Sequence, residues 1–571
     1  MERFKGVIKK DFLIKDAINK MAGSHENKFI AGMAVVVDEE NKVVGVISDG
    51  DIRRGILKGI DIESTVERIA NFKPITVNKN QTKSQMAKEI IDKCDKRNTS
   101  YKKYSKIILV DNENKFYDVI FASDIFEEII ESKNIAVYGM GYIGLTLAAV
   151  FANTEFKVTG IEKNEITLND LKNGKIHFYE NGLESLLQST LQNCSLNFSS
   201  PTDQIKADVY IICAGTPFNQ ETNKADLSSI CEVSKNIARI IKKDDLVILR
   251  STVPLGTSRN IVVPILEESG LKAGEDFYLS FAPERTIEGN AIEELRTLPQ
   301  VIGGINQKSL EITSRLFSKI TKTIVEVDSL EEAEMVKLMN NTFRDLVFSF
   351  SNEVSYICEK FNINTFKLIE AANDGYIRNP IPNPSPGVGG PCLSKDPYLY
   401  SLSDSLFGGN AILGKVSRQI NSSGSKYVYG KILKFCNLTK KDINELKIFI
   451  IGIAFKGMPE TSDIRDSVAV ELIKMLPEKK NIFIKDFVVP KKDIIKLGCN
   501  YIEDIIEGFK EIDAVMVLNN HYKNNKFNLM DTLVYTNKPC MFFDGWDLFN
   551  QAEIEKFNKT YYSTLGYMTK R

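Results

Sequence analysis

Closely spaced metal ligands are the first thing that this chain lacks. It has only three histidines, His25, His177 and His521, which lie far apart in the sequence. Its nine cysteines are an odd number, and no two of them form a CxxC pair. Zinc and histidine metal sites need such ligands at short spacing, and a disulfide framework needs an even set of cysteines. We therefore expect no metal ion and cysteines that stay reduced.

Net charge and long apolar runs are missing too. Lysine and arginine total 74 against 75 aspartates and glutamates, so no overall field favours nucleic acid or an anionic membrane. No apolar run approaches the roughly 20 residues of a membrane span. The first residues, MERFKGVIKKDF, lack the apolar core of a signal peptide. The sequence predicts a soluble, cytoplasmic protein of several globular domains, with no nucleic-acid partner and no membrane partner.

The first part of the chain contains an internal duplication. The segment VDEENKVVGVISDGDI, starting at Val37, aligns without gaps to VDNENKFYDVIFASDI, starting at Val110. Each copy predicts a strand, an acidic turn, a second strand and a helix that begins near Asp51 or Asp124. The duplication resembles a tandem pair of cystathionine-beta-synthase (CBS) domains over residues 1–132.

The CBS resemblance implies a ligand for the first copy. In that family a serine or threonine shortly before the aspartate, together with the aspartate, often holds the ribose of an adenine nucleotide. Copy one has Ser48 and Asp51, whereas copy two has Phe121 in place of the serine. One adenine-nucleotide site at Ser48 and Asp51 is therefore expected. The alternative is a degenerate pair that only packs against its own chain or a neighbour.

A dinucleotide-binding pattern follows the duplication. In NIAVYGMGYIGLTLAAVF an apolar strand runs into Gly139, Gly141 and Gly144 and then into an apolar helix. Glycines allow a tight turn, and the helix start offers free N–H groups to a pyrophosphate. The next strand ends at Glu162, whose carboxylate can accept both ribose hydroxyls and would repel a 2′-phosphate. The pattern favours NAD over NADP.

Further motifs lie on the segments that follow. Two more strands are expected to end at AGTP, with Thr216, and at RSTVP, with Thr252. The stretch from Glu331 to Phe361 predicts one long helix on which Lys337, Asn341 and Arg344 share a face. A second αβ domain begins at LKIFIIGIAFKG.

One cysteine stands in an unusual setting. Cys392 lies in GVGGPCLSKD, a glycine-rich loop that also carries Lys395 and Asp396. Free cysteine is usually a small buried hydrophobic residue, so the residue alone leaves filler and nucleophile both open.

These pieces, in this order, resemble the UDP-glucose/GDP-mannose dehydrogenase family from Asn134 to the C-terminus. The motifs that carry the resemblance are GMGYIG, AGTP, RSTVPLGT, APERTIEGNA, AEMVKLMNNTFRD, GVGGPCLSKD and GIAFKGMPETSDIRDS. It implies an α/β protein with two Rossmann-like doubly wound domains, joined by a long central helical region and preceded by the CBS pair. The expected domains are residues 1–132, 133–328 (NAD binding), 329–430 (central, catalytic) and 431–571 (UDP-sugar binding).

The family oxidises C6 of a nucleotide-bound sugar to a carboxylate and uses two NAD per sugar. The resemblance therefore implies a UDP-sugar substrate. The implied catalytic residues are Cys392 as nucleophile, then Lys337, Asn341, Asp396, Glu284, Glu288 and Thr252. The implied NAD contacts are Gly139, Gly141, Tyr142, Ile143, Gly144, Glu162, Thr216, Thr252 and Lys395. The implied substrate contacts are Arg285, Lys337, Asn341, Arg344, Gly389, Lys456 and Arg465. We also expect a homo-oligomer, a dimer or higher.

Departures from the UDP-glucose pattern bear on the substrate. UDP-glucose members typically have NPEFLREG and GGSCFPKD, where this chain has APERTIEG and GGPCLSKDP. With Arg344 in NTFRD, these differences resemble the branch that acts on UDP-N-acetylmannosamine or UDP-N-acetylglucosamine. Glu288 and Lys395 are closer to the UDP-glucose pattern and keep that substrate open. A third possibility, of another class, is a nucleotide-sensing regulatory protein without turnover, against which the complete set around Cys392 argues.

The implied chemistry explains why a thiol is needed. The second oxidation requires a tetrahedral C6 that bears oxygen and hydrogen. A thiolate that adds to the aldehyde gives a thiohemiacetal, which can be oxidised to a thioester and cleaved by water. Lys337 and Asn341 can stabilise the oxyanions that form, and Asp396 or a glutamate can move protons through a bound water.

Overall fold

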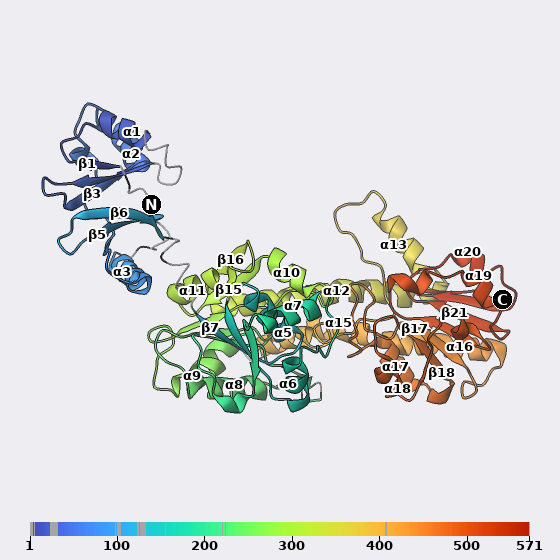
Figure 1. Ribbon diagram of the computed structural model, residues 1–571. Helices are drawn as coiled ribbons and strands as arrows, with labels where there is room; N and C mark the ends of the chain where they lie inside the picture. Colours follow the sequence, from blue (N-terminus) through green and yellow to red (C-terminus); the bar gives the residue numbers. More distant parts are fainter. Residues whose placement is uncertain are drawn as a thin grey trace. The chain divides into compact units, whose positions relative to one another are not determined.

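The computed structural model describes Phe4 and residues 6–22, 32–97, 99, 104–122, 125, 133–154, 156–219, 221–222, 224–405 and 408–569. Asp124 lies outside this range, and so does the helix start that is expected there in the second repeat. The chain divides into two compact units, Met1–Lys133 and Asn134–Arg571 (Figure 1).

The first unit contains the predicted repeat as two similar three-stranded sheets. Copy one consists of β1 (Val7–Lys9), α1 (Ile14–Ala22), β2 (Met33–Val37), β3 (Val43–Ser48) and α2 (Asp49–Leu57). Copy two consists of β4 (Thr76–Asn78), α3 (Lys83–Asp95), β5 (Lys106–Val110) and β6 (Phe116–Phe121). In each copy the first two strands are parallel and the last two antiparallel, with an irregular register at the same place, Val36/Val37 or Leu109/Val110.

The two copies pair through equivalent hairpins. The N–H of Val43 donates to the carbonyl of Asn114 (3.0 Å), and the N–H of Phe116 donates to that of Asn41 (2.9 Å). Val43 is equivalent to Phe116, and Asn41 to Asn114, so each copy donates the same hydrogen bond to the other. Both sheets also contribute to one apolar cluster, which contains Val35 and Ile108. The two repeats are therefore a single packed unit.

The second unit begins with an eight-stranded sheet in the order β16-β15-β14-β13-β10-β7-β8-β9, in which only β14 and β15 are antiparallel. Its strands are β7 (Asn134–Tyr138), β8 (Lys157–Ile161), β9 (Leu196–Ser199), β10 (Val209–Ile212), β13 (Leu246–Leu249), β14 (Tyr278–Phe281), β15 (Gln300–Gly304) and β16 (Ile324–Val327). Its helices are α5 (Tyr142–Ala152), α6 (Glu165–Lys172), α7 (Leu183–Gln192), α8 (Ser228–Ala238), α9 (Val263–Glu267), α10 (Ala291–Thr297) and α11 (Gln307–Phe317). The inner strands are apolar on both faces because helices cover both sides of the sheet.

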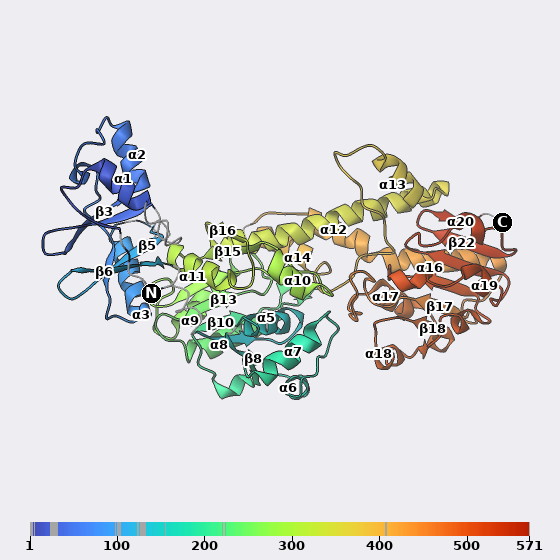
Figure 2. The same ribbon diagram turned by 45° about the horizontal axis from the view of Figure 1, so that its top comes forward.

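The predicted long helix is confirmed as α12 (Leu330–Phe361), which begins at the N-cap Ser329 and ends at Asn362 in the left-handed conformation. It extends from the first sheet towards the second (Figure 2). The other central helices are α13 (Thr365–Asn373), α14 (Asp396–Ser405), α15 (Leu413–Ser422) and α16 (Gly424–Thr439). The last of these, α16, runs across the expected boundary at residue 430.

A second doubly wound sheet ends the chain, in the order β19-β18-β17-β20-β21-β22-β23. Its strands are β17 (Ile448–Ile451), β18 (Ile482–Lys485), β19 (Asn500–Tyr501), β20 (Ala514–Val517), β21 (Cys540–Asp544), β22 (Thr560–Thr564) and β23 (Tyr567–Met568). Helices α17 (Val468–Met475), α18 (Lys491–Ile495), α19 (Leu529–Leu533) and α20 (Gln551–Ile554) accompany it. Each sheet places its first strand beside its fourth, β7 beside β10 and β17 beside β20, and in such sheets ligands commonly bind at the carboxyl ends of these strands. No described helix has the length and apolar character to cross a membrane.

Candidate active site

A cavity of about 910 Å³ lies at the carboxyl ends of the first sheet. It is bounded by the turn after β7, the Cys392 loop and the segment Ser462–Arg465 of the C-terminal domain. The predicted site residues that line it are Gly139, Gly141, Tyr142, Ile143, Glu162, Thr216, Thr252, Glu284, Glu288, Lys337, Cys392, Lys395 and Arg465. Residues from three predicted domains thus meet in one space.

The glycine turn has the shape that a pyrophosphate requires. Gly139 has a φ of 92°, in the left-handed region that favours glycine. A Cβ on residue 144 would lie 1.8 Å from the carbonyl oxygen of Gly139, so only glycine at this position lets α5 pack so closely against the turn. A Cβ on Gly141 would meet nothing within 4 Å, and this N-cap has no side chain to bond the first N–H groups of α5. Those groups remain available to an anion.

The acidic residue after β8 supports the same turn. Glu162 accepts hydrogen bonds from the N–H of Met140 (3.0 Å) and of Asn164 (2.8 Å), one on each carboxylate oxygen. At the neighbouring strand ends, the hydroxyl of Thr216 donates to the carbonyl of Thr252 (2.6 Å). The glycine turn and Glu162 together fit NAD: the turn would hold the pyrophosphate and the carboxylate a ribose.

Three predicted residues around the thiol are linked by hydrogen bonds. Asp396, which is fully buried at the start of α14, accepts from the amide of Asn341 (2.6 Å) and from Lys395 (2.7 Å). Lys337, on α12 with Asn341, is 5% exposed and lines the cavity. Asn341 and Asp396 do not line the cavity, but Asp396 is hydrogen-bonded to Lys395, which does.

Cys392 is exposed within the cavity, although protein surrounds it on several sides. This enclosure raises the pKa of the thiol to about 11, and the nearby Lys337 opposes the shift. The free protein therefore holds a thiol rather than a thiolate, and a neighbouring group must take its proton when sulfur reacts.

Two glutamates on the loop after β14 differ in their surroundings. Glu284 is 6% exposed, and its Oε1 lies 3.9 Å from Nη2 of the buried Arg250. Glu288 is half-buried, and burial, with Asp463 nearby, raises its pKa to about 7. A carboxyl with a pKa near neutrality can both accept and donate a proton, which suits general acid–base chemistry.

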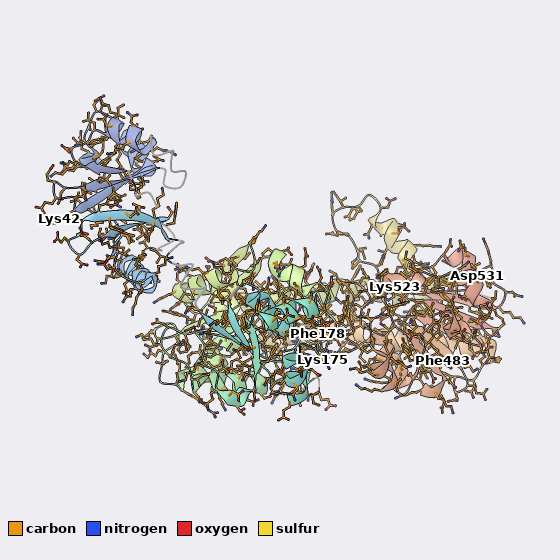
Figure 3. All side chains as sticks on the ribbon, in the orientation of Figure 1. Lys42, Lys175, Phe178, Phe483, Lys523 and Asp531 are labelled. Carbon is orange, nitrogen blue, oxygen red and sulfur yellow. The ribbon has the colours of Figure 1, made fainter. Side chains whose placement is uncertain are left out.

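The C-terminal domain closes one side of the cavity. Arg465 is held by the carboxylate of Asp463 (Nε to Oδ2, 2.8 Å), and its guanidinium lies 5.8 Å from the ring of Tyr142. Tyr142 stacks in turn on Phe178 at 3.9 Å between ring centroids; Figure 3 labels Phe178. The ammonium of Lys456 donates to the carbonyl of Glu288 (2.6 Å), so it supports the glutamate loop and does not line the cavity.

Some predicted residues are not brought together. Arg285 is exposed and only reaches the carbonyl of Pro299 (3.4 Å). Arg344 is exposed beside the ring of Phe348 and does not line the cavity, but it lies close to Lys456, and burial together with this neighbouring charge lowers the pKa of that ammonium. Gly389 lies against the carbonyl of Asp466, which a Cβ would approach to 2.1 Å, so its contact is with the other domain and not with the cavity.

Several residues of the site were missed by sequence reasoning. Arg250 stands in the RSTVP motif and Asp463 in the DIRDS motif, so their positions beside predicted residues were available as a signal. Glu180 was not: its buried carboxylate accepts from the N–H groups of Gly289 (2.7 Å) and Ala291 (2.8 Å), far away in the sequence. It holds the loop that carries Glu288.

The glycine turn, the acidic strand end and the cavity at the carboxyl ends of the first sheet fit a dinucleotide-dependent enzyme, in which a second doubly wound domain closes one side of the cavity. Family comparisons agree. The chain matches the UDP-glucose/GDP-mannose dehydrogenase family in its NAD binding domain (residues 133–321), its central domain (331–422) and its UDP binding domain (449–551). Residues 7–58 match the CBS domain.

Individual relatives are similar over most of their length. The chain is 34% identical to a UDP-N-acetyl-D-mannosamine dehydrogenase of Campylobacter jejuni, over 68% of this chain and 95% of the relative. It is 32% identical to one of Methanococcus maripaludis, over 72% and 92%. Among solved structures, the UDP-N-acetyl-mannosamine dehydrogenase of Staphylococcus aureus superposes with a TM-score of 0.64 at 30% identity, over 76% of this chain and 98% of that one.

The chain belongs to the UDP-glucose/GDP-mannose dehydrogenase family and carries an N-terminal CBS domain. It is an NAD-dependent oxidoreductase.

Proposed function

We propose that the protein is a 6-dehydrogenase that oxidises C6 of a UDP-N-acetylhexosamine, UDP-ManNAc or UDP-GlcNAc, to the uronic acid. The observation that carries the proposal is the exposure of the Cys392 thiol in the same cavity as the glycine turn, Lys337 and Glu288. The names of the relatives support an N-acetylated sugar. Arg465, beside the cavity and in the UDP binding domain, is proposed to hold the diphosphate.

Each residue of the cavity is proposed to act at a particular step. Bound NAD supplies the hydride acceptor for both oxidations. In the first, the C6 hydroxyl gives up its proton to Glu288 through a bound water, while Lys337 stabilises the oxygen. The sulfur of Cys392 then adds to the aldehyde carbon, and the thiol proton passes through a bound water to the aldehyde oxygen, which becomes the hydroxyl of a thiohemiacetal. After Glu288 has passed its first proton to solvent, loss of the C6 hydrogen as hydride to the bound acceptor and of the hydroxyl proton to Glu288 leaves a thioester.

Hydrolysis completes the proposed cycle. A water adds to the thioester carbon, Glu284 or Glu288 accepts the proton of that water, and the C–S bond breaks to give carboxylate and thiol. Asn341 and Asp396 are proposed to act from outside the cavity lining, since the amide of Asn341 donates to Asp396 and Asp396 also holds Lys395. Thr252 and Thr216 are proposed to line the nicotinamide side.

The substrate is tested by measuring initial rates of NADH formation with UDP-ManNAc, UDP-GlcNAc, UDP-glucose and GDP-mannose. We expect an N-acetylated UDP-sugar to exceed UDP-glucose, because a buried hydrogen bond to the acetamido group is worth about 1–3 kcal/mol. A clear preference for UDP-glucose would select that alternative. No NADH with any sugar, from protein that binds NAD and UDP-sugar, would select the regulatory protein without turnover.

We propose an adenine nucleotide as the ligand of the first CBS copy. Ser48 and Asp51 are close together there: the hydroxyl of Ser48 donates to Oδ2 of Asp51 (2.6 Å), and Oδ1 accepts from the exposed Arg54 (2.6 Å). A ribose would have to displace Arg54. Calorimetric titration of the full chain with ATP and AMP should give binding that Asp51→Ala weakens and that Asp61→Ala, at an exposed aspartate of the same copy, leaves unchanged. No binding to folded protein would remove the idea.

We also propose that the protein forms a homo-oligomer through α12. Five large apolar side chains on this helix are exposed: Met339 (54%), Phe343 (65%), Phe350 (52%), Ile357 (54%) and Phe361 (72%). Their spacing of four and seven residues places them on one face, opposite the face that carries Lys337 and Asn341. Such an apolar stripe suits a second copy of itself across a two-fold axis.

A further inference from the structure

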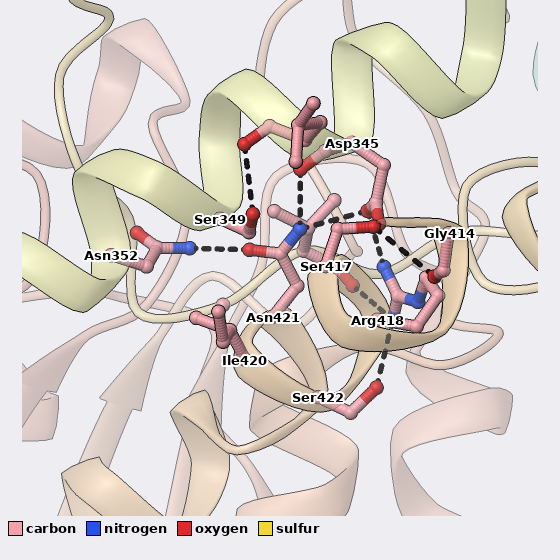
Figure 4. A network of polar contacts seen from close by, with 12 residues as sticks. Asp345, Ser349, Asn352, Gly414, Ser417, Arg418, Ile420, Asn421 and Ser422 are labelled. Atoms are coloured by element: carbon pink, nitrogen blue, oxygen red, sulfur yellow. Dashed lines mark hydrogen bonds and ion pairs between the residues drawn. The ribbon is translucent and has the colours of Figure 1, made fainter. Parts of the chain in front are cut away.

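A buried polar network lies behind the Cys392 loop, and the proposed chemistry does not use it. At its centre Arg418 of α15 donates to Asp345 of α12, with Nη1 and Oδ1 2.7 Å apart (Figure 4). Asp345 is fully buried, Arg418 is 3% exposed, and neither lines the cavity. Because two buried charges lose most of their hydration, such a pair contributes little net stability. We therefore ask which part of the backbone the Asp345–Arg418 pair holds in place.

The network ends on the backbone that leads to the thiol. Arg418 donates through Nη2 to the carbonyl of Val388 (3.1 Å), and the N–H of Val388 donates to the carbonyl of Asn421 (3.4 Å). The Asn421 side chain donates to Oδ1 of Asp345 (2.8 Å) and accepts from Asn352 (2.9 Å). Asn352 in turn accepts from the N–H of Ser385 (2.8 Å). Residues 385–388 are thus tied to α12 and α15 just before Cys392.

The chain after the thiol returns to the same helix. Asp396, four residues beyond Cys392, is bonded to Asn341. Asn341, Asp345 and Asn352 lie on one face of α12, the face that also presents Lys337 to the cavity. The segment that carries Cys392 is therefore fastened on both sides to the helix that supplies the cation of the site.

We infer that the Asp345–Arg418 pair, together with Asn352, positions Cys392 so that its sulfur can reach C6. This inference rests on the proposed function, in which Cys392 is the nucleophile. Asp345, Arg418 and Asn352 are positioning residues, since they touch the loop and not the substrate. The first oxidation requires no S–C bond, whereas the second does. A loosened loop should therefore impair the second oxidation selectively.

The test uses Arg418→Lys, which keeps the charge and loses the planar two-pronged donor. The milder Asn352→Ala removes the tie to Ser385 and leaves the ion pair. The matched control is Lys431→Met. Lys431, on α16, is a buried ion-pair partner of Glu359 on α12, and this pair does not contact the Cys392 loop. Thermal unfolding shows that the variants are folded.

Two measurements follow. The first is the ratio of NADH formed to UDP-sugar consumed, with hydroxylamine present to trap aldehyde. The second is the rate at which iodoacetamide alkylates Cys392 in protein without ligands, read by peptide mass, with the exposed Cys194 as internal reference. A misplaced reacting atom can cost about 100-fold in rate. For Arg418→Lys we expect such a fall in uronic acid formation, with an unchanged KM for the UDP-sugar.

The expected ratio for Arg418→Lys falls from two NADH per sugar towards one, with aldehyde trapped as the oxime. The alkylation rate of Cys392 should change several-fold while that of Cys194 stays constant, and Asn352→Ala should show the same changes to a smaller extent. If folded Arg418→Lys and Asn352→Ala both keep two NADH per sugar and the wild-type alkylation rate, the inference is wrong. If Arg418→Lys does not fold, Asn352→Ala decides by the same criteria. Failure of the proposed function is distinguishable, because Cys392→Ala would then itself form uronic acid.

Discussion

At the scale of single residues, burial raises the pKa of both the Cys392 thiol and its proposed proton acceptor, Glu288. Burial raises the pKa of Cys392 to about 11, and Lys337 counteracts it. Burial also raises the pKa of Glu288, to about 7, which makes it the proton acceptor of the cavity near neutral pH. In this account the thiol is activated as it reacts and is not stored as a thiolate.

Substitutions of Cys392 distinguish a nucleophilic cysteine from one that only fills space. Cys392→Ala should fold and bind NAD and UDP-sugar, yet form almost no uronic acid, because no thiohemiacetal can form. Cys392→Ser should accumulate a covalent sugar adduct, because an oxygen ester is a poorer acyl donor than a thioester. Peptide mass analysis after incubation with substrate and NAD checks the adduct at residue 392. Uronic acid formation by Cys392→Ala at a rate near that of the wild type would show that the cysteine only fills space.

The pH dependence of the reaction tests Glu288. As a proton acceptor it must be ionised, so log(kcat/KM), which reports groups of the free protein, should rise with pH below about 7 and level off above it. Glu288→Gln should lower kcat and remove this rise, while Asp404→Asn, on α14 and away from the cavity, should keep it. An unchanged acidic limb in Glu288→Gln would assign the proton transfer to another group.

At the scale of elements, α12 is fixed to the first sheet by a buried carboxylate. Glu334 accepts from the N–H of Gly256 (2.5 Å) and of Ser258 (2.8 Å), and burial raises its pKa to about 7 from 4.5. The folded state therefore binds this proton more tightly than the unfolded state. The contribution to stability is full below about pH 4.5 and falls as pH rises to about 7.

Glu334→Gln removes that titration. Its Tm should be lower than that of the wild type at about pH 5, because one backbone N–H loses a good acceptor, and the gap should narrow at about pH 8. Thermal unfolding of both proteins at the two pH values checks this. Glu288 titrates in both proteins and cancels in the comparison. A gap that stays constant or widens with pH would contradict the assignment.

The exposed apolar face of α12 is the proposed contact between two copies of the chain, so a charge placed on it should disrupt assembly. Phe350→Glu should shift the protein to a smaller species in light scattering, because a carboxylate in the middle of the stripe would be buried without a partner. Ile166→Glu, at a 76% exposed position on α6, is the control and should leave the mass unchanged. A wild-type protein that is monomeric at assay concentrations would exclude the proposed oligomer.

The elements were more predictable than the contacts between them. The length of α12 followed from its apolar spacing and lack of proline, and the turn after β7 followed from three glycines. Helical spacing predicted that Arg344 shares a face with Lys337 and Asn341, but it could not predict which residue of the C-terminal domain lies near it, here Lys456. The Asp345–Arg418 pair could not be found at all, because α12 and α15 meet only in the tertiary structure.

At the scale of the whole molecule, two units with different tasks share one chain. The unit of two repeats has its own core and its own internal pairing, and the second unit contains the whole cavity within Asn134–Arg571. Any regulation of catalysis by a nucleotide at Ser48 and Asp51 requires that the ligand bind two states of the protein with different affinity.

The central claim, a two-step oxidation at C6 through Cys392, is tested most directly by stoichiometry. Wild-type protein is incubated with limiting UDP-ManNAc or UDP-GlcNAc and excess NAD, and NADH and the sugar product are measured together at completion. The account predicts two NADH per sugar consumed and a UDP-linked uronic acid as the product. One NADH per sugar with an aldehyde or ketone as the final product would contradict it.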